Sequence, residues 1–185
     1  HCGLSLQSSN SNDPAQFSET LFGINKYKMS DNFSSYFAEG PDFTTQYWVS
    51  LQNYKRIFEA EGNERDADFR ARRGAGVYVY DGVSRVISRK YLKNDDSVIP
   101  LIRLPEMYYI LCEMSSLADA PQYINTVRSH RGISKSNAYS SFANDAARTS
   151  ALSKEYRKEF YAEGQYFYFL KHHGIKNLDY SHEAN

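Results

Sequence analysis

Residues 157–174 read RKEFYAEGQYFYFLKHHG, a stretch in which aromatic side chains surround one carboxylate, Glu163. With Leu152 as the origin, large side chains recur at steps of three and four, which is the spacing of one face of an α-helix. That face comprises Leu152, Tyr156, Phe160, Glu163, Phe167 and Leu170. A charge on an apolar helix face needs a partner, and the small residues Ala162 and Gly164 would let one approach closely.

The partner of Glu163 decides between two kinds of chemistry. An ion pair with Arg103, Arg128 or Arg157 would fix how the last helix docks on the rest of the chain. Alternatively, carboxylates on helices could be the acid and base of a glycosidase, which needs one carboxyl group on each side of the scissile bond. We favour the buried ion pair, because aromatic rings rather than loops flank this carboxylate. On that interpretation, Glu163→Ala prevents folding at a cost of about 3–5 kcal/mol.

Two further helices are predicted upstream. One follows Pro100 and ends near Leu117, and the other ends at Gly132. Their apolar stripes are Leu104, Met107, Leu111 and Met114 in the first, and Ala120, Tyr123, Ile124 and Val127 in the second. As an antiparallel pair, these helices would bury both stripes. After a Ser- and Asn-rich connection, the last helix is predicted to run unbroken over residues 145–172.

The chain before residue 98 predicts loops and short strands. Residues 1–17 are polar and without a period, which indicates a loop or an extended tail. Residues 20–29 predict a strand, and residues 30–45 predict a long surface loop broken at Gly40-Pro41.

Three more segments follow before the helical pair. Residues 48–61 have helical spacing, and residues 65–73 are a dense charge run that we interpret as a solvated turn. Two strands around Asp81-Gly82, over residues 76–80 and 84–92, predict a β-hairpin.

Composition excludes several classes of function. Lys plus Arg and Asp plus Glu each number 22, so no net charge draws the chain to nucleic acid or to anionic lipid. No stretch approaches the roughly 20 apolar residues of a membrane span. Cys2 and Cys112 cannot make a disulfide framework. The length of 185 residues suits one domain or one and a half.

Five segments in order carry a family pattern. The last has Arg157, a core of Phe160, Glu163 and Gly164, and an aromatic Leu-Lys ending over residues 169–171. The earlier four are SETLFGI at 18–24, RDADFR at 65–70, IPLIRLPEMYYILCE at 99–113 and INTVRSHRGI at 124–133. Together they resemble the C-terminal portion of the SusD/RagB family of outer-membrane, glycan-binding lipoproteins.

The resemblance implies a fold and a domain organisation. We expect a mainly α, SusD-like C-terminal region with a tetratricopeptide-like helical pair, a small β-hairpin and long loops. Residues 1–185 would form a single domain, in which 1–17 is a loop or tail, 18–98 holds loops, strand and hairpin, and 99–174 is helical. Family members are normally longer, so we expect this chain to be a C-terminal part or a truncated relative.

Aromatic residues near the predicted loop are the candidate ligand site. Tyr and Trp offer flat apolar faces that stack on sugar rings, and aromatic side chains make up 15% of the chain. The candidates for carbohydrate binding are Trp48, Tyr47, Tyr36 and Phe43. Trp48 could equally anchor the adjacent helix in the core. We expect no metal site, because the adjacent residues His172 and His173 would point about 100° apart on a helix; a cap at the helix C-terminus suits them better.

The function implied by the resemblance is binding without catalysis. We expect the protein to hold an oligosaccharide at the outer surface of the outer membrane for a SusC-like TonB-dependent transporter. Neither a cofactor nor nucleic acid is expected, and a lipid anchor outside this chain would attach it to the membrane. The alternative is a protein–protein interaction module that contacts the transporter without itself binding sugar. An enzyme such as a glycosidase is the weakest hypothesis.

Overall fold

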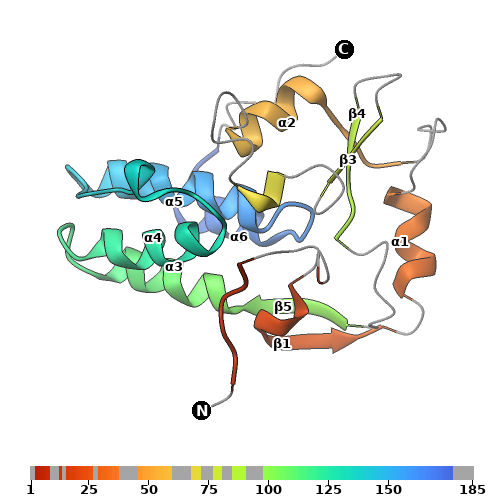
Figure 1. Ribbon diagram of the computed structural model, residues 1–185, viewed down its shortest axis with the longest axis horizontal. Coiled ribbons are helices and arrows are strands. Elements are labelled where there is room, and N and C mark those ends of the chain that lie inside the picture. Colours follow the sequence, from red (N-terminus) through yellow and green to blue (C-terminus); the bar gives the residue numbers. More distant parts are fainter. Residues whose placement is uncertain are drawn as a thin grey trace.

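The computed structural model describes residues 3–8, 13, 16–26, 29–37, 46–59, 68–71, 77–80, 85–90 and 98–176. The helices are α1 (Met29–Phe37), α2 (Leu51–Phe58), α3 (Leu104–Met114), α4 (Ala120–His130), α5 (Asp145–Glu159) and α6 (Gln165–His172). The strands are β1 (Thr20–Asn25), β2 (Val49–Ser50), β3 (Val77–Tyr80), β4 (Arg85–Ser88) and β5 (Val98–Arg103). Helices α3 to α6 pack together at one end of the molecule, and two small sheets with α1 and α2 occupy the other (Figure 1). The predicted fold class, mainly α with a small hairpin, is confirmed.

Helices α3 and α4 form the predicted pair. Both begin with a proline in the first turn, where the missing N–H costs no intrahelical hydrogen bond. The predicted stripe of α4 is confirmed, since Ala120, Ile124 and Val127 are fully buried.

The face predicted for α3 is wrong. Leu111 and Met114 are 47% and 80% exposed, whereas Tyr109 and Cys112 are fully buried. The ring of Tyr109 packs 5.1 Å from that of Tyr156 on α5, and this aromatic contact orients the helix. Apolar character alone could not show which side of α3 would meet α5.

The last helix is broken, so the prediction of one helix over residues 145–172 is also wrong. Residues 160–164 separate α5 from α6. Ala162 and Gly164 have φ angles of 62° and 90°, in the left-handed region that interrupts a right-handed helix. The change of direction leaves Phe167 59% exposed, although the uninterrupted spacing placed it in the core.

Strands β1 and β5 pair antiparallel, with Gly23 opposite Pro100. A Cβ at Gly23 would lie 2.7 Å from Cγ1 of Val98 and 3.0 Å from the carbonyl oxygen of Ile99, so only glycine fits this close approach. The strand predicted over 20–29 is confirmed in its first part. Residues 99–103 were predicted as part of the helical region, but they belong to strand β5. Their sequence follows no strand period, and they take their extended conformation from pairing with β1.

The second sheet has the strand order β2-β4-β3 and contains the predicted hairpin. β3 and β4 pair antiparallel, with Tyr80 opposite Arg85, and their turn lies outside the described residues. The helix predicted over 48–61 is confirmed for its central part, which is α2, whereas Val49 and Ser50 form strand β2 instead. Part of the predicted 30–45 loop is instead α1, and the rest, from residue 38, lies outside the described part of the chain.

Charged side chains fill the centre of the molecule. We call this set the charged core: Glu19, Asp68, Arg70, Lys90, Arg103, Arg128, Arg131, Glu155, Lys158, Glu159 and Glu163. At its centre, Oε1 of Glu159 accepts hydrogen bonds of 2.8 Å from both Arg103 and Arg131. Its Oε2 accepts from Arg131 at 2.9 Å and from Arg70 at 3.2 Å.

Glu163 is buried and ion-paired, as predicted. Arg103 donates from Nε and Nη2 to its two oxygens, each at 3.0 Å, and Lys90 pairs with it as well. Arg103 was a predicted partner and Lys90 was not. Arg128, the second candidate, pairs instead with Glu155.

Two segments distant in sequence also join the charged core. Arg131 binds Glu19 through Nη1 and Nη2 at 3.0 and 2.7 Å. Arg70 binds Asp68 at 2.7 Å and Glu155 at 2.9 Å, and both Asp68 and Arg70 are buried. The solvated turn predicted over residues 65–73 is therefore wrong for these two residues, because opposite charges on α5 neutralise Arg70.

The charged core sets the ionisation of its carboxylates. Burial opposes ionisation of Glu159, but Arg131 and Arg103 outweigh it and hold the pKa of Glu159 well below its usual range. Burial likewise opposes ionisation of Glu155, yet Arg70, Lys158 and Arg128 lower its pKa far below the usual value.

Removing one charge from this core should destabilise the fold strongly. We expect Glu163→Gln to lower the free energy of unfolding by about 3–5 kcal/mol, because it leaves Arg103 and Lys90 buried with unbalanced charge. Asp145→Asn is the matched control, since the Asp145 side chain is 80% exposed and its pairing with Arg148 is worth less than about 1 kcal/mol. Urea unfolding followed by circular dichroism measures both. Equal, small losses in the two variants would contradict a buried network.

Stability should also fall in acid. The lowered pKa values of Glu155 and Glu159 mean that the unfolded chain binds more protons than the native chain as the pH drops below about 4.5, the ordinary glutamate value. Their contribution is therefore complete above about pH 5 and is lost as pH falls toward the folded-state pKa values. Urea unfolding between pH 3 and 8 should show a plateau followed by a steep acid decline. A free energy of unfolding unchanged down to pH 3 would rule out this linkage.

Candidate functional site

Aromatic side chains gather where α1 meets the segment before β2. We call them the aromatic cluster: Phe33, Tyr36, Phe37 and Tyr47. Residues 33, 36 and 37 lie on one face of α1, because side chains three and four apart are neighbours on a helix. Tyr47 stacks on Tyr36 with ring centroids 5.6 Å apart and contacts Phe37 at 6.0 Å.

Tyr36 and Tyr47 form an exposed stacked pair. The backbone N–H of Tyr47 donates a 2.7 Å hydrogen bond to the carbonyl oxygen of Tyr36, which joins the segment to the helix. The two residues remain 49% and 66% exposed. Large exposed rings held in a fixed arrangement suit stacking against the apolar face of a ligand, while their hydroxyl groups supply hydrogen bonds.

Trp48, the strongest single candidate from the sequence, has a different environment. It is half-buried, and the guanidinium carbon of Arg85 lies 4.3 Å from its ring centroid. This cation–π contact connects the indole to β4. The structure therefore brings Tyr36 and Tyr47 together. Trp48 follows Tyr47 directly in the chain, and Phe43 lies outside the described residues.

Phe33 and Arg85 were not predicted as members of this site. The helical spacing of Phe33 with Tyr36 and Phe37 was a usable signal, but it was hidden because the segment was interpreted as a loop. The approach of Arg85 to Trp48 depends on the pairing of β2 with β4, for which the sequence carries no local signal.

The buried carboxylates offer no access for acid–base chemistry. The side chains of Glu159 and Glu163 have no exposed area, and Arg103 forms an ion pair with each of them. A glycosidic bond cannot enter between them. Their geometry supports the structural interpretation over the glycosidase hypothesis at this position.

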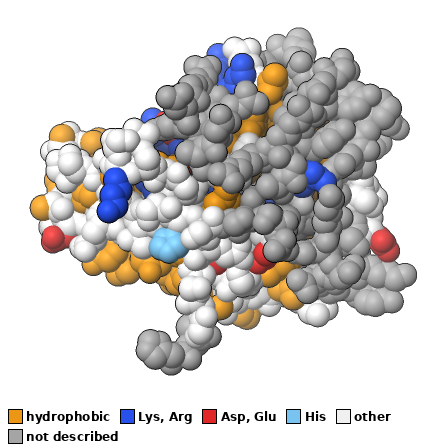
Figure 2. All heavy atoms as spheres, viewed as in Figure 1, with side chains coloured by type: hydrophobic (Ala, Val, Ile, Leu, Met, Phe, Trp, Pro, Cys, Tyr) orange, Lys and Arg blue, Asp and Glu red, His pale blue; other side chains and the backbone are white. Residues whose placement is uncertain are grey.

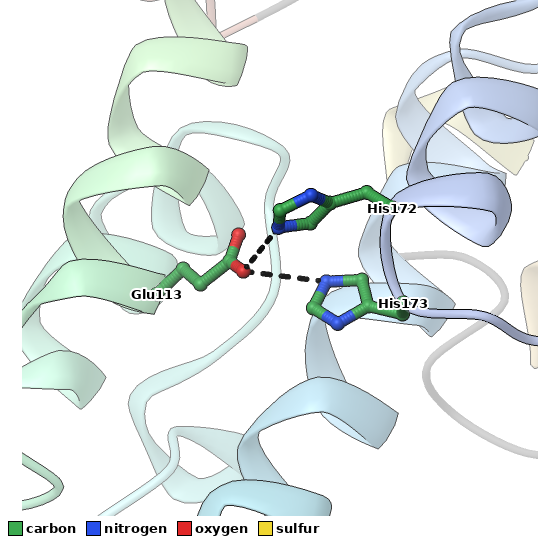
Figure 3. A group of neighbouring side chains, drawn as sticks. All are labelled: Glu113, His172 and His173. Carbon is green, nitrogen blue, oxygen red and sulfur yellow. Dashed lines mark hydrogen bonds and ion pairs between the residues drawn. The ribbon is translucent and has the colours of Figure 1, made fainter.

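A second polar cluster lies between α3 and the end of α6. Nε2 of His172 lies 3.1 Å from Oε1 of Glu113, and Nε2 of His173 lies 3.5 Å from the same oxygen (Figure 3). The sequence indicated that the two histidines would point apart. They converge on Glu113 because His173 is the residue that caps α6, and the two rings lie 4.8 Å apart at 77°.

Comparisons with known proteins identify the fold and the family. A solved structure, the crystal structure of a SusD superfamily protein from Bacteroides fragilis NCTC 9343, aligns with a TM-score of 0.62 at 19% sequence identity. The alignment covers 90% of this chain and 44% of that one, so the chain spans less than half the length of the structure it matches. None of the curated proteins compared matches the sequence. The model of the SusD family matches residues 11–171, most of the chain, and the protein therefore belongs to the SusD family.

Proposed function

We propose that the protein is a non-catalytic glycan-binding component of an outer-membrane nutrient uptake system. The exposed pair of Tyr36 and Tyr47 carries this proposal, because two stacked rings fixed by a backbone hydrogen bond offer a preformed surface for a sugar ring. Membership of the SusD family supports the same role.

The site we propose extends from this pair to Trp48. Tyr47 and Trp48 are consecutive, and the guanidinium of Arg85 lies over the indole of Trp48. Phe43 stays a predicted contact. Since the rings are already ordered by one another, a ligand would lose little affinity to ordering them.

The partner and the location follow from the same proposal. The oligosaccharide would pass to a SusC-like TonB-dependent transporter at the cell surface. Within the described ranges, no helix has both the length and the apolar character to cross a bilayer. Attachment through a lipid anchor outside the described residues is part of the proposal.

One further observation favours the second candidate, an interaction module that contacts the transporter. The ribbon of β1 and β5 exposes a set of large apolar side chains: Leu21, Phe22, Ile24, Leu101 and Ile102. Along the edge where α3 lies, hydrophobic side chains also reach the surface (Figure 2); Ile110, Leu111 and Met114 are exposed there. Exposed apolar surfaces of this kind are typical of protein–protein contacts.

A glycan titration separates the two candidates. Trp48 is the only tryptophan, so its fluorescence reports on ligands that reach the proposed site. Against a panel of oligosaccharides, we expect a saturable shift for at least one glycan, without release of reducing ends. Tyr47→Ala should lower the affinity for that glycan by about tenfold or more, because a central aromatic contact is removed.

The matched control is Tyr168→Ala, which removes an equally large ring that is 71% exposed on α6. Its affinity for the glycan should equal that of the parent chain. Equal weakening in both variants, or unchanged affinity in Tyr47→Ala, would place the glycan elsewhere. No response to any glycan would favour the interaction module, and released reducing ends would indicate an enzyme.

A further inference from the structure

We propose that Glu113, His172 and His173 form a binding site for a divalent transition-metal ion such as Zn²⁺, which links the end of α6 to α3. The three side chains come from two elements and converge on a common point (Figure 3). One carboxylate oxygen and two imidazole nitrogens are a donor set that suits zinc, nickel and copper.

The spacing of the donor atoms fits one ion. Ligands about 2.0–2.1 Å from a tetrahedral zinc lie about 3.3 Å from one another. The two distances from Oε1 of Glu113, 3.1 Å to His172 and 3.5 Å to His173, bracket that value. All donor atoms lie within 4.8 Å of one another, so the two imidazole nitrogens need to approach each other by at most about 1.5 Å to reach that spacing.

The side chains are suited to that adjustment. His172 is 68% exposed and can turn without disturbing the core, whereas His173 is mostly buried, and its ring lies 4.4 Å from that of Phe169. Nε2 of His173 makes no hydrogen bond within the described part of the chain, and its nearest anionic contact is Glu113.

A salt bridge from a protonated histidine to Glu113 is the competing explanation for the same contacts. It predicts no affinity for metal. The metal site further predicts an open coordination position, because three protein ligands leave one for water or a ligand oxygen. Glu113 and His172 also line a groove of about 350 Å³ with Ile110, Met114 and Tyr168, which leaves room for such a ligand.

Calorimetric titration of the chain, produced without a histidine tag, tests the site. We expect saturable binding of one Zn²⁺ per chain and a rise in melting temperature, with no binding of Mg²⁺ or Ca²⁺, which prefer sites made wholly of oxygen ligands. Glu113→Gln and His173→Gln should each lower the affinity for Zn²⁺ by about tenfold or more.

His130→Gln is the control, since His130 lies on α4 and its Nδ1 contacts the carbonyl oxygen of Thr126. It should bind Zn²⁺ as the parent chain does, and circular dichroism should show that all variants are folded. Two results would overturn the proposal: no Zn²⁺ binding by the parent chain, or equal Zn²⁺ affinity in the double variant His172→Gln/His173→Gln. The second result would locate the ion on histidines or cysteines elsewhere.

Discussion

Glu159 is held between Arg103, Arg131 and Arg70, and most of the fold is arranged to make this possible. The arginines come from the end of β5, the end of α4 and a short turn before β3, so one carboxylate at the end of α5 joins three separate parts of the chain. Each ion costs several kcal/mol to bury, and the cost is recovered only when every partner is in place. The network therefore favours one arrangement of these elements over alternatives that bury the same apolar surface.

The break between α5 and α6 belongs to the same constraint. Left-handed residues at 162 and 164 end the helix directly after Glu159 and direct Glu163 to Arg103 and Lys90. Lys90 also donates a 2.8 Å hydrogen bond to the carbonyl oxygen of Glu159. Because Lys90 follows β4, and β4 pairs with the strand after Trp48, the charged core also connects the helical end of the molecule to the sheet beside the aromatic cluster.

Sequence patterns predicted the elements whose signals are local. The stripe of α4, the hairpin of β3 and β4 and the burial of Glu163 with Arg103 follow from spacing, turn residues and the cost of an unpaired charge. The face of α3, strand β5 and the burial of Asp68 and Arg70 could not be predicted in this way, because each depends on a partner distant in sequence. In the candidate site, Tyr36 and Tyr47 were found from their type and neighbourhood, while the role of Phe33 required knowing that residues 29–37 are helical.

A double-mutant cycle between Arg131 and Glu159 tests the central claim most directly. Nε and Nη2 of Arg131 bind the two carboxylate oxygens of Glu159 at 2.9 and 2.8 Å, so this contact at the centre of the charged core is bidentate. Urea unfolding of Arg131→Met, Glu159→Gln and the double variant should give a coupling energy of about 1–3 kcal/mol, with the double variant less destabilised than the sum of the single ones. Additive effects within about 0.5 kcal/mol would show that the two charges are independent and would contradict the account.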